Sequence, residues 1–235
     1  MGFLLSEEGI QSDPEKINAI AKFPPPENIT QLRSFLGMVG ALPTVSSQIA
    51  TLIGPLRELR KSNNVFLWQQ EHSDAFEALK SHIVNSDTVL ALFDPSRPTR
   101  LETDASRLNG LGFVLRQLHE DSWRIVQCGS RFLTDAETRY AVIELELLAL
   151  VWATKKLHVY LFGLENYEVL LDHAPLIPIL NKYSLNAIEN PRLLRLREKI
   201  QAYNFTAFHI KGKDNFISDA PVSYTHLRAH ETINH

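Results

Sequence analysis

Apolar residues recur at helical spacing through roughly the first ninety residues of the chain. A capping box at 12–15, with proline at the first helical position, predicts the start of one helix, and the prolines at 24–26 end it. A second start signal lies at 28–31, and a third apolar face covers 70–84. Residues 1–91 are therefore predicted to form a small, mainly helical segment.

The pattern changes at the turn-rich stretch 94–98, which predicts a domain boundary at residue 92. Short strand-like runs and helical runs follow it. The predicted strands are 99–103, 112–117, 123–128, 167–171 and 205–210, and the predicted helices are 134–161, 174–180 and 190–203. This order is typical of an α/β domain with a single mixed sheet, placed at 92–221.

Composition and charge exclude several classes of protein. The formal net charge is −3, which taken globally argues against a simple polyanion binder. The single cysteine, Cys128, excludes an internal disulfide framework and a multi-cysteine zinc site. The start of the chain has no signal-peptide pattern, and the uncharged stretch 34–56 is interrupted by glycine, proline and polar residues. We therefore expect a soluble protein that is not secreted and does not span a membrane.

Carboxylates occupy unusual positions in the predicted α/β domain. Asp104 and Asp172 end two strands, where aspartate often serves only as a turn or cap residue, and Asp219 lies near the end of the chain. Glu146 lies two residues after Glu144 in an otherwise apolar helix, so the two side chains point about 200° apart. If Glu144 faces water, Glu146 faces the sheet.

An inward carboxylate is unfavourable unless it is paired or bound to a metal. Two strand-end aspartates and an inward glutamate would suit hard cations, which prefer oxygen ligands. The corresponding chemistry is hydrolysis at phosphorus with two metals about 4 Å apart.

These carboxylates lie in motifs that together resemble the ribonuclease H domain in the Pol polyprotein of gypsy-type LTR retrotransposons. The motifs are Glu102-Thr103-Asp104-Ala105-Ser106, Ser130-Arg131-Phe132-Leu133-Thr134, Glu144-Leu145-Glu146-Leu147-Leu148-Ala149, Tyr160-Leu161-Phe162-Gly163, Asp172-His173-Ala174-Pro175-Leu176, Gly212-Lys213-Asp214-Asn215 and Ser218-Asp219-Ala220. The segment before residue 92 resembles the end of the polymerase palm, the thumb and the connection of the same polyprotein.

The resemblance implies an RNase H-like five-stranded mixed sheet with flanking helices. It also implies endonucleolytic hydrolysis of the RNA strand in an RNA–DNA hybrid. Its four-carboxylate site would bind two Mg²⁺, with Mn²⁺ as a substitute, through Asp104, Glu146, Asp172 and Asp219. Asp104 and Asp172 would contact both metals, Glu146 one metal and the 2′-OH side, and Asp219 the second metal.

Other parts of the chain depart from the family pattern. No Tyr-x-Asp-Asp motif occurs, so we expect no polymerase activity from this chain alone. An aromatic and arginine-rich stretch is replaced by residues 40–47. From Val222 the residues match the translation of a transposase adapter used in sequencing libraries. Residues 222–235 are therefore predicted to be read-through, without the helix that should support Asp219.

A histidine and a basic segment lie beside the expected site. His209 resembles the mobile histidine of many RNase H enzymes, or it simply alternates on the last strand; His173 is expected to make a local hydrogen bond. Residues 190–213 carry a net charge of +5, which leaves −8 for the rest of the chain. We expect the bases of this segment to contact phosphate rather than to form a merely solvated face. They are Arg192, Arg195, Lys199, Lys211 and Lys213, and Lys155 and Lys156 extend the group.

The sequence thus leaves three functional alternatives. The first is a Pol fragment with RNase H activity on RNA–DNA hybrids, acting beside the palm, fingers and integrase of the polyprotein. It would work in the cytoplasmic particle of the element, or alternatively in the nucleus. The second is a nucleic-acid-binding remnant whose nuclease is inactive because the chain is truncated after Asp219. The third, another RNase H-like enzyme such as an integrase, is disfavoured by the motif context.

Overall fold

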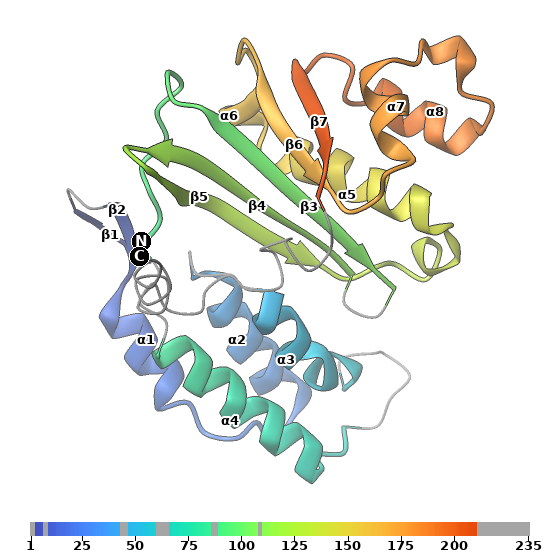
Figure 1. Ribbon diagram of the computed structural model, residues 1–235. Helices are drawn as coiled ribbons and strands as arrows, with labels where there is room; N and C mark the ends of the chain where they lie inside the picture. Colours follow the sequence, from blue (N-terminus) through green and yellow to red (C-terminus); the bar gives the residue numbers. More distant parts are fainter. Residues whose placement is uncertain are drawn as a thin grey trace, which may run out of the picture.

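The computed structural model describes residues 3–6, 9–42, 47–59, 66–85, 89–107 and 110–210. Their apolar side chains form two separate cores, one within the first 83 residues and one between residues 91 and 207. Figure 1 shows a group of helices below an α/β unit, as the change of pattern near residue 92 predicts.

The first core is built by four helices. They are α1 (Pro14–Ala21), α2 (Ile29–Gly40), α3 (Ser47–Glu58) and α4 (Gln70–Val84). Phe35 and Phe76 are fully buried, with ring centroids 4.5 Å apart. Asn28 caps α2 by accepting from the amides of Thr30 and Gln31, which confirms the second start signal. The apolar pattern did not predict α3.

A two-stranded hairpin, which the apolar pattern did not predict, precedes these helices in the mainly helical segment. Strand β1 (Phe3–Ser6) pairs antiparallel with β2 (Gly9–Ser12). Ile10 of β2 exchanges two backbone hydrogen bonds with Leu90, and the next amide, Ala91, donates to the carbonyl of Ile125. The linker between the two cores therefore joins the hairpin to the edge of the larger sheet.

The larger sheet has five strands in the order β5-β4-β3-β6-β7. They are β3 (Thr99–Ser106), β4 (Gly110–His119), β5 (Ser122–Arg131), β6 (Tyr167–Leu171) and β7 (Phe205–His209). The first three form an antiparallel meander, whereas β6 runs parallel to both β3 and β7. This arrangement confirms the predicted mixed α/β sheet. The predicted strands were found in full, apart from Ile210 at the end of the last one, and the first three extend further than predicted.

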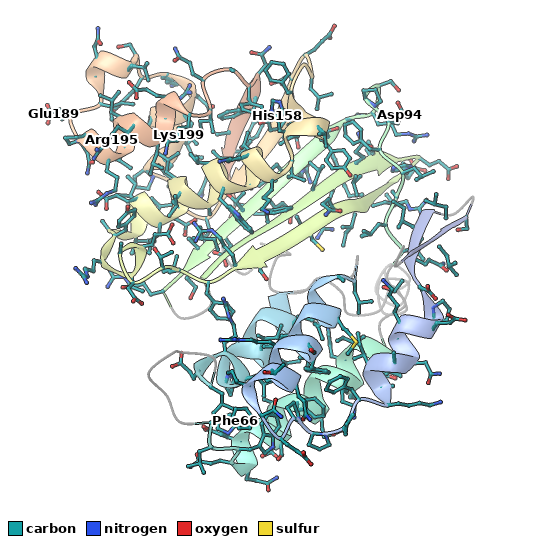
Figure 2. The ribbon with its side chains drawn as sticks, turned by 180° about the vertical axis from the view of Figure 1, so that it is seen from behind. Phe66, Asp94, His158, Glu189, Arg195 and Lys199 are labelled. Atoms are coloured by element: carbon teal, nitrogen blue, oxygen red, sulfur yellow. The ribbon has the colours of Figure 1, made fainter. Side chains whose placement is uncertain are left out.

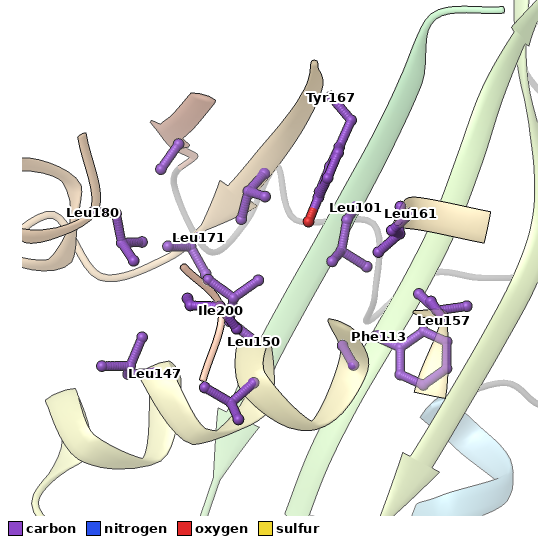
Figure 3. Packing of buried hydrophobic residues seen from close by; sticks show 14 of the residues in the cluster. Leu101, Phe113, Leu147, Leu150, Leu157, Leu161, Tyr167, Leu171, Leu180 and Ile200 are labelled. Atoms are coloured by element: carbon purple, nitrogen blue, oxygen red, sulfur yellow. The ribbon is translucent and has the colours of Figure 1, made fainter. Parts of the chain in front are cut away.

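Helices cover the sheet and complete the second core. They are α5 (Val142–Lys156), α6 (His158–Leu161), α7 (Leu176–Asn181) and α8 (Pro191–Glu198), with 3-10 turns η1 (Glu137–Arg139) and η2 (Leu185–Ala187). Leu147 and Leu150 of α5 are fully buried and lie near Leu101 of β3 and Phe113 of β4 (Figure 3). Burial of this apolar face holds α5 across the sheet.

The single helix predicted over 134–161 is wrong. The capping pair does form, because Glu137 accepts from the Thr134 amide and its own amide donates to the Thr134 hydroxyl. It opens only η1, however, since Tyr140 and Ala141 are extended and α5 begins after them. A second break follows α5, and α8 ends at Glu198, short of the predicted 203.

None of the helices in the described ranges is long and apolar enough to cross a membrane.

Candidate active site

Two aspartates lie at the same end of the sheet: Asp172 directly follows β6, whereas Asp104 lies within β3 and does not end it as predicted. Thr103 of β3 is the register partner of Leu171 of β6, and each is followed directly by an aspartate, Asp104 or Asp172. Because β3 and β6 are parallel, their carboxyl ends coincide. Strand register thus brings the two predicted aspartates to neighbouring positions.

The next parallel strand adds a histidine at this edge. Leu171 pairs with His209 of β7, and His209 Nε2 lies 3.8 Å from the Asp172 carboxylate. About 40% of each of these two side chains is exposed. His173 is half-buried, and its backbone carbonyl accepts from the Leu176 amide at the start of α7.

Glu146 reaches the site from the first turns of α5. It is 5% exposed, which confirms that it points inward. Burial, followed by repulsion from Asp104 and Asp172, raises the pKa of Glu146 to about 8. Burial likewise raises the pKa of Asp104, with Asp172 adding to the effect and the Ala105 amide opposing it. These carboxylates therefore lie close enough to destabilise one another's charges.

Glu146 and the two aspartates beside it carry oxygen atoms of the kind that bind hard cations. Glu146 Oε2 is buried and has no hydrogen-bond partner among the described residues, and its neighbours are further carboxylate oxygens. This donor chemistry fits Mg²⁺. Within the described ranges, however, no three His, Cys, Asp or Glu side chains gather closely enough to form a metal centre. The fourth predicted carboxylate, Asp219, lies outside the described residues.

The premise that Glu144 faces water is wrong. Glu144 is 5% exposed because α8 packs against α5 and covers it. Its carboxylate accepts from Arg192 Nη1 at 2.7 Å, from Asn190 Nδ2 at 3.2 Å and from the Ala141 amide at 3.0 Å. Burial opposes ionisation, but these donors together keep the pKa of Glu144 below its usual value. The spacing argument found Glu146 but could not show that both sides of α5 are covered.

The predicted phosphate-contacting residues fall into separate groups. Arg195 and Lys199 are exposed on and just after α8 (Figure 2), whereas Arg192 is bound to Glu144. Arg197, from the same basic segment, turns inward and donates to the carbonyl of Leu180 at 3.1 Å. Lys211 and Lys213 lie outside the described residues.

The predicted group of phosphate-contacting bases also included Lys155 and Lys156, which lie at the other end of α5. Both lysines are exposed in its last turn, roughly 14 Å along the helix axis from Glu146. They are not beside the residues that Arg192 contacts.

Sequence comparison places this geometry in a known context. Residues 68–169 match the family described as an RNase H-like domain found in reverse transcriptase. The match begins before the boundary predicted at residue 92. The chain is 32% identical to the Pol polyprotein of the Drosophila melanogaster transposon gypsy and 35% identical to that of transposon 297, in each case over 94% of this chain. The Tf2-3 transposon polyprotein of Schizosaccharomyces pombe is 33% identical over the same share.

The chain spans about a fifth of the length of the Drosophila relatives: 21% of the gypsy polyprotein and 20% of the 297 polyprotein. Among solved structures, a foamy viral protease–reverse transcriptase in complex with an RNA/DNA hybrid superposes with a TM-score of 0.72. That match covers 96% of this chain and 30% of the viral one at 18% identity, and it supports the fold. The chain thus carries an RNase H-like domain of the kind found in reverse transcriptases, and over 94% of its length it is similar to part of the Pol polyproteins of gypsy-type retrotransposons.

Proposed function

We propose that this chain hydrolyses the RNA strand of RNA–DNA hybrids by means of its RNase H-like domain. The observation that carries the proposal is the meeting of Asp104, Asp172 and Glu146 at the carboxyl ends of parallel strands, with the Glu146 pKa raised to about 8 by burial and by the two aspartates. A buried glutamate beside two further carboxylates is unfavourable for folding alone. Strongly shifted carboxylates in such a place are typical of catalytic sites.

The proposed cofactor is Mg²⁺, held by Asp104, Glu146 and Asp172 together with Asp219. When bound, two such ions would supply an activated water and stabilisation of the leaving oxygen. The protein's own part is to hold oxygen ligands at one edge of a rigid sheet. The unpartnered Oε2 of Glu146 supports this role, because a cation would provide the partner that the described residues do not.

The proposed substrate follows from the exposed bases on and just after α8 and from the family. Arg195 and Lys199 are free of carboxylate partners within the described ranges, so they can meet backbone phosphates. Hybrids are distinguished from DNA duplexes by their 2′-hydroxyl groups and shape. We further propose that the missing palm and fingers of the polyprotein act beside this chain, as its resemblance to part of Pol suggests.

The decisive experiment incubates the whole chain with an end-labelled RNA–DNA hybrid and Mg²⁺, beside single-stranded RNA and duplex DNA. We expect cleavage of the hybrid's RNA strand alone. Asp104→Asn keeps the shape of the side chain but removes its charge, and it should lower the rate on the order of a thousandfold.

Equal cleavage by the wild-type chain and by Asp104→Asn would reveal a contaminating nuclease. Absence of cleavage by both, with hybrid binding retained, would instead identify a nucleic-acid-binding remnant.

A further inference from the structure

The start of α5 is tied to two other segments by a cluster outside the carboxylate site. Glu144 Oε2 accepts from Arg192 Nη1 at 2.7 Å, and Oε1 accepts from Asn190 Nδ2 at 3.2 Å. Both donors belong to the start of α8, and Asn190 also caps that helix through the amides of Arg192 and Leu193. One buried carboxylate therefore joins the first turns of α5 and α8.

Tyr140 extends this cluster towards β3. The guanidinium of Arg192 lies 4.0 Å from the centre of the Tyr140 ring, within the range of a cation–π contact. The backbone carbonyl of Tyr140 accepts from Arg107 Nη2 at 3.2 Å, and Arg107 follows directly after the end of β3. We call Arg107, Tyr140, Glu144, Asn190 and Arg192 the α5 anchor.

The anchor also bears on Glu146, whose carboxyl group accepts a hydrogen bond from the backbone amide of Ala105 in β3. Glu146 follows Glu144 by two residues and is repelled by Asp104 and Asp172 across the site. Its Oε2 has no hydrogen-bond partner in the described part of the chain. The position of Glu146 against β3 therefore depends on where the first turns of α5 are held.

We propose that Arg192 is a positioning residue, which fixes Glu146 against Asp104 through Glu144 and Tyr140. This proposal rests on the proposed nuclease function and differs from the phosphate contact that the basic pattern of α8 predicts for Arg192. One Nη of Arg192 is committed to Glu144, and its planar face to Tyr140. Arg195 and Lys199 stay available for phosphate, so the two tasks are divided along one helix.

The first test does not require activity. Amide hydrogen exchange of the whole chain is compared between wild type, Arg192→Ala and Arg139→Ala, in the presence of a chelator. Arg139 is the matched control, because it is exposed in η1 and no contact of its side chain is recorded in the described ranges. We expect exchange at 143–147 to rise about tenfold in Arg192→Ala only, with β7 unchanged. Unchanged exchange at 143–147 would overturn the proposal.

The second test separates positioning from substrate binding. In single-turnover cleavage, Arg192→Ala should lower the rate at saturating hybrid about tenfold and change the hybrid Kd less than twofold. Glu144→Gln should have the same effect on the rate. Because this substitution removes no positive charge, its effect cannot come from a lost phosphate contact. Arg192→Lys should recover part of the rate, because a lysine can still pair with Glu144.

A higher Kd with a normal saturated rate would make Arg192 a phosphate contact and would refute the positioning role. If the wild-type chain does not cleave at all, the nuclease proposal fails, whereas the exchange experiment still decides whether Arg192 holds α5.

Discussion

Thr103 and Leu171 are register partners in the parallel part of the sheet, so the aspartates that follow them lie in neighbouring positions at one end of it. Glu146 enters the same place from α5, on a helix held by packing and by the α5 anchor. The site therefore combines rigid strands with a helix whose position is fixed by contacts elsewhere in the domain. The predictions below test the two parts separately.

The buried glutamate should make the chain less stable as the pH rises. Glu146 has a pKa of about 8 in the folded chain against 4.5 when unperturbed. The folded state therefore binds more protons between these two values, and stability falls as the pH increases from about 5 to 8. The free energy of unfolding should fall by up to about 1.4 kcal/mol per pH unit in this range. Urea denaturation in a chelator at several pH values measures it.

Glu146→Gln should remove most of this slope, because the side chain can no longer ionise. A slope that is the same in wild type and Glu146→Gln would show that Glu146 is not the titrating group.

The loop before α5 should lose stability in acid. Arg131 donates two hydrogen bonds to Glu137, at 2.7 and 2.8 Å. Together with a hydrogen bond from the Thr134 amide, they lower the Glu137 pKa to about 2. The stability that ionised Glu137 contributes to the fold is therefore complete above about pH 4.5 and is lost as the pH falls towards 2. Glu137→Gln should destabilise the chain at pH 7 by about 1–2 kcal/mol. Near pH 2 the variant and the wild type should converge, and a difference that persists there would contradict this assignment.

Gly9 should be essential for docking the hairpin onto the linker. Its φ is +137°, and a Cβ there would collide with the carbonyl of Leu90. Gly9→Ala should therefore destabilise the chain by about 1–3 kcal/mol and expose the Ile10 and Leu90 amides to exchange. Gly37 is the matched control, since it lies in α2 with no atom near its Cβ position. Gly37→Ala should be neutral or stabilise by up to about 1 kcal/mol, and similar losses in both variants would argue against the collision.

The exposed bases of α8 should control how hybrid binding depends on salt. Arg195→Ala and Lys199→Ala should each weaken binding and reduce the slope of log K against log salt by about 0.8. Glu198 is exposed beside them, so Glu198→Gln should leave affinity equal or higher. Fluorescence anisotropy with a labelled hybrid at several salt concentrations measures these slopes. Losses that do not depend on salt would exclude a phosphate contact.

The sequence by itself determined the strands, the change of class near residue 92 and the identity of Asp104, Glu146 and Asp172 as carboxylates of interest. These features are local, since alternation, turn residues and charge spacing are visible within short windows. The same information missed β1, β2 and α3, and it merged η1, α5 and α6 into one helix.

Only the tertiary structure decided how these parts meet. Parallel register placed Asp104 and Asp172 at one end of the sheet, and α8 covered Glu144, which the spacing argument had left in water. Glu144 therefore became a buried partner of Arg192, and one base of the predicted stripe is paired with a carboxylate of the same chain. Which carboxylates face each other depends on contacts between residues far apart in the chain, and no short-range periodicity encodes them.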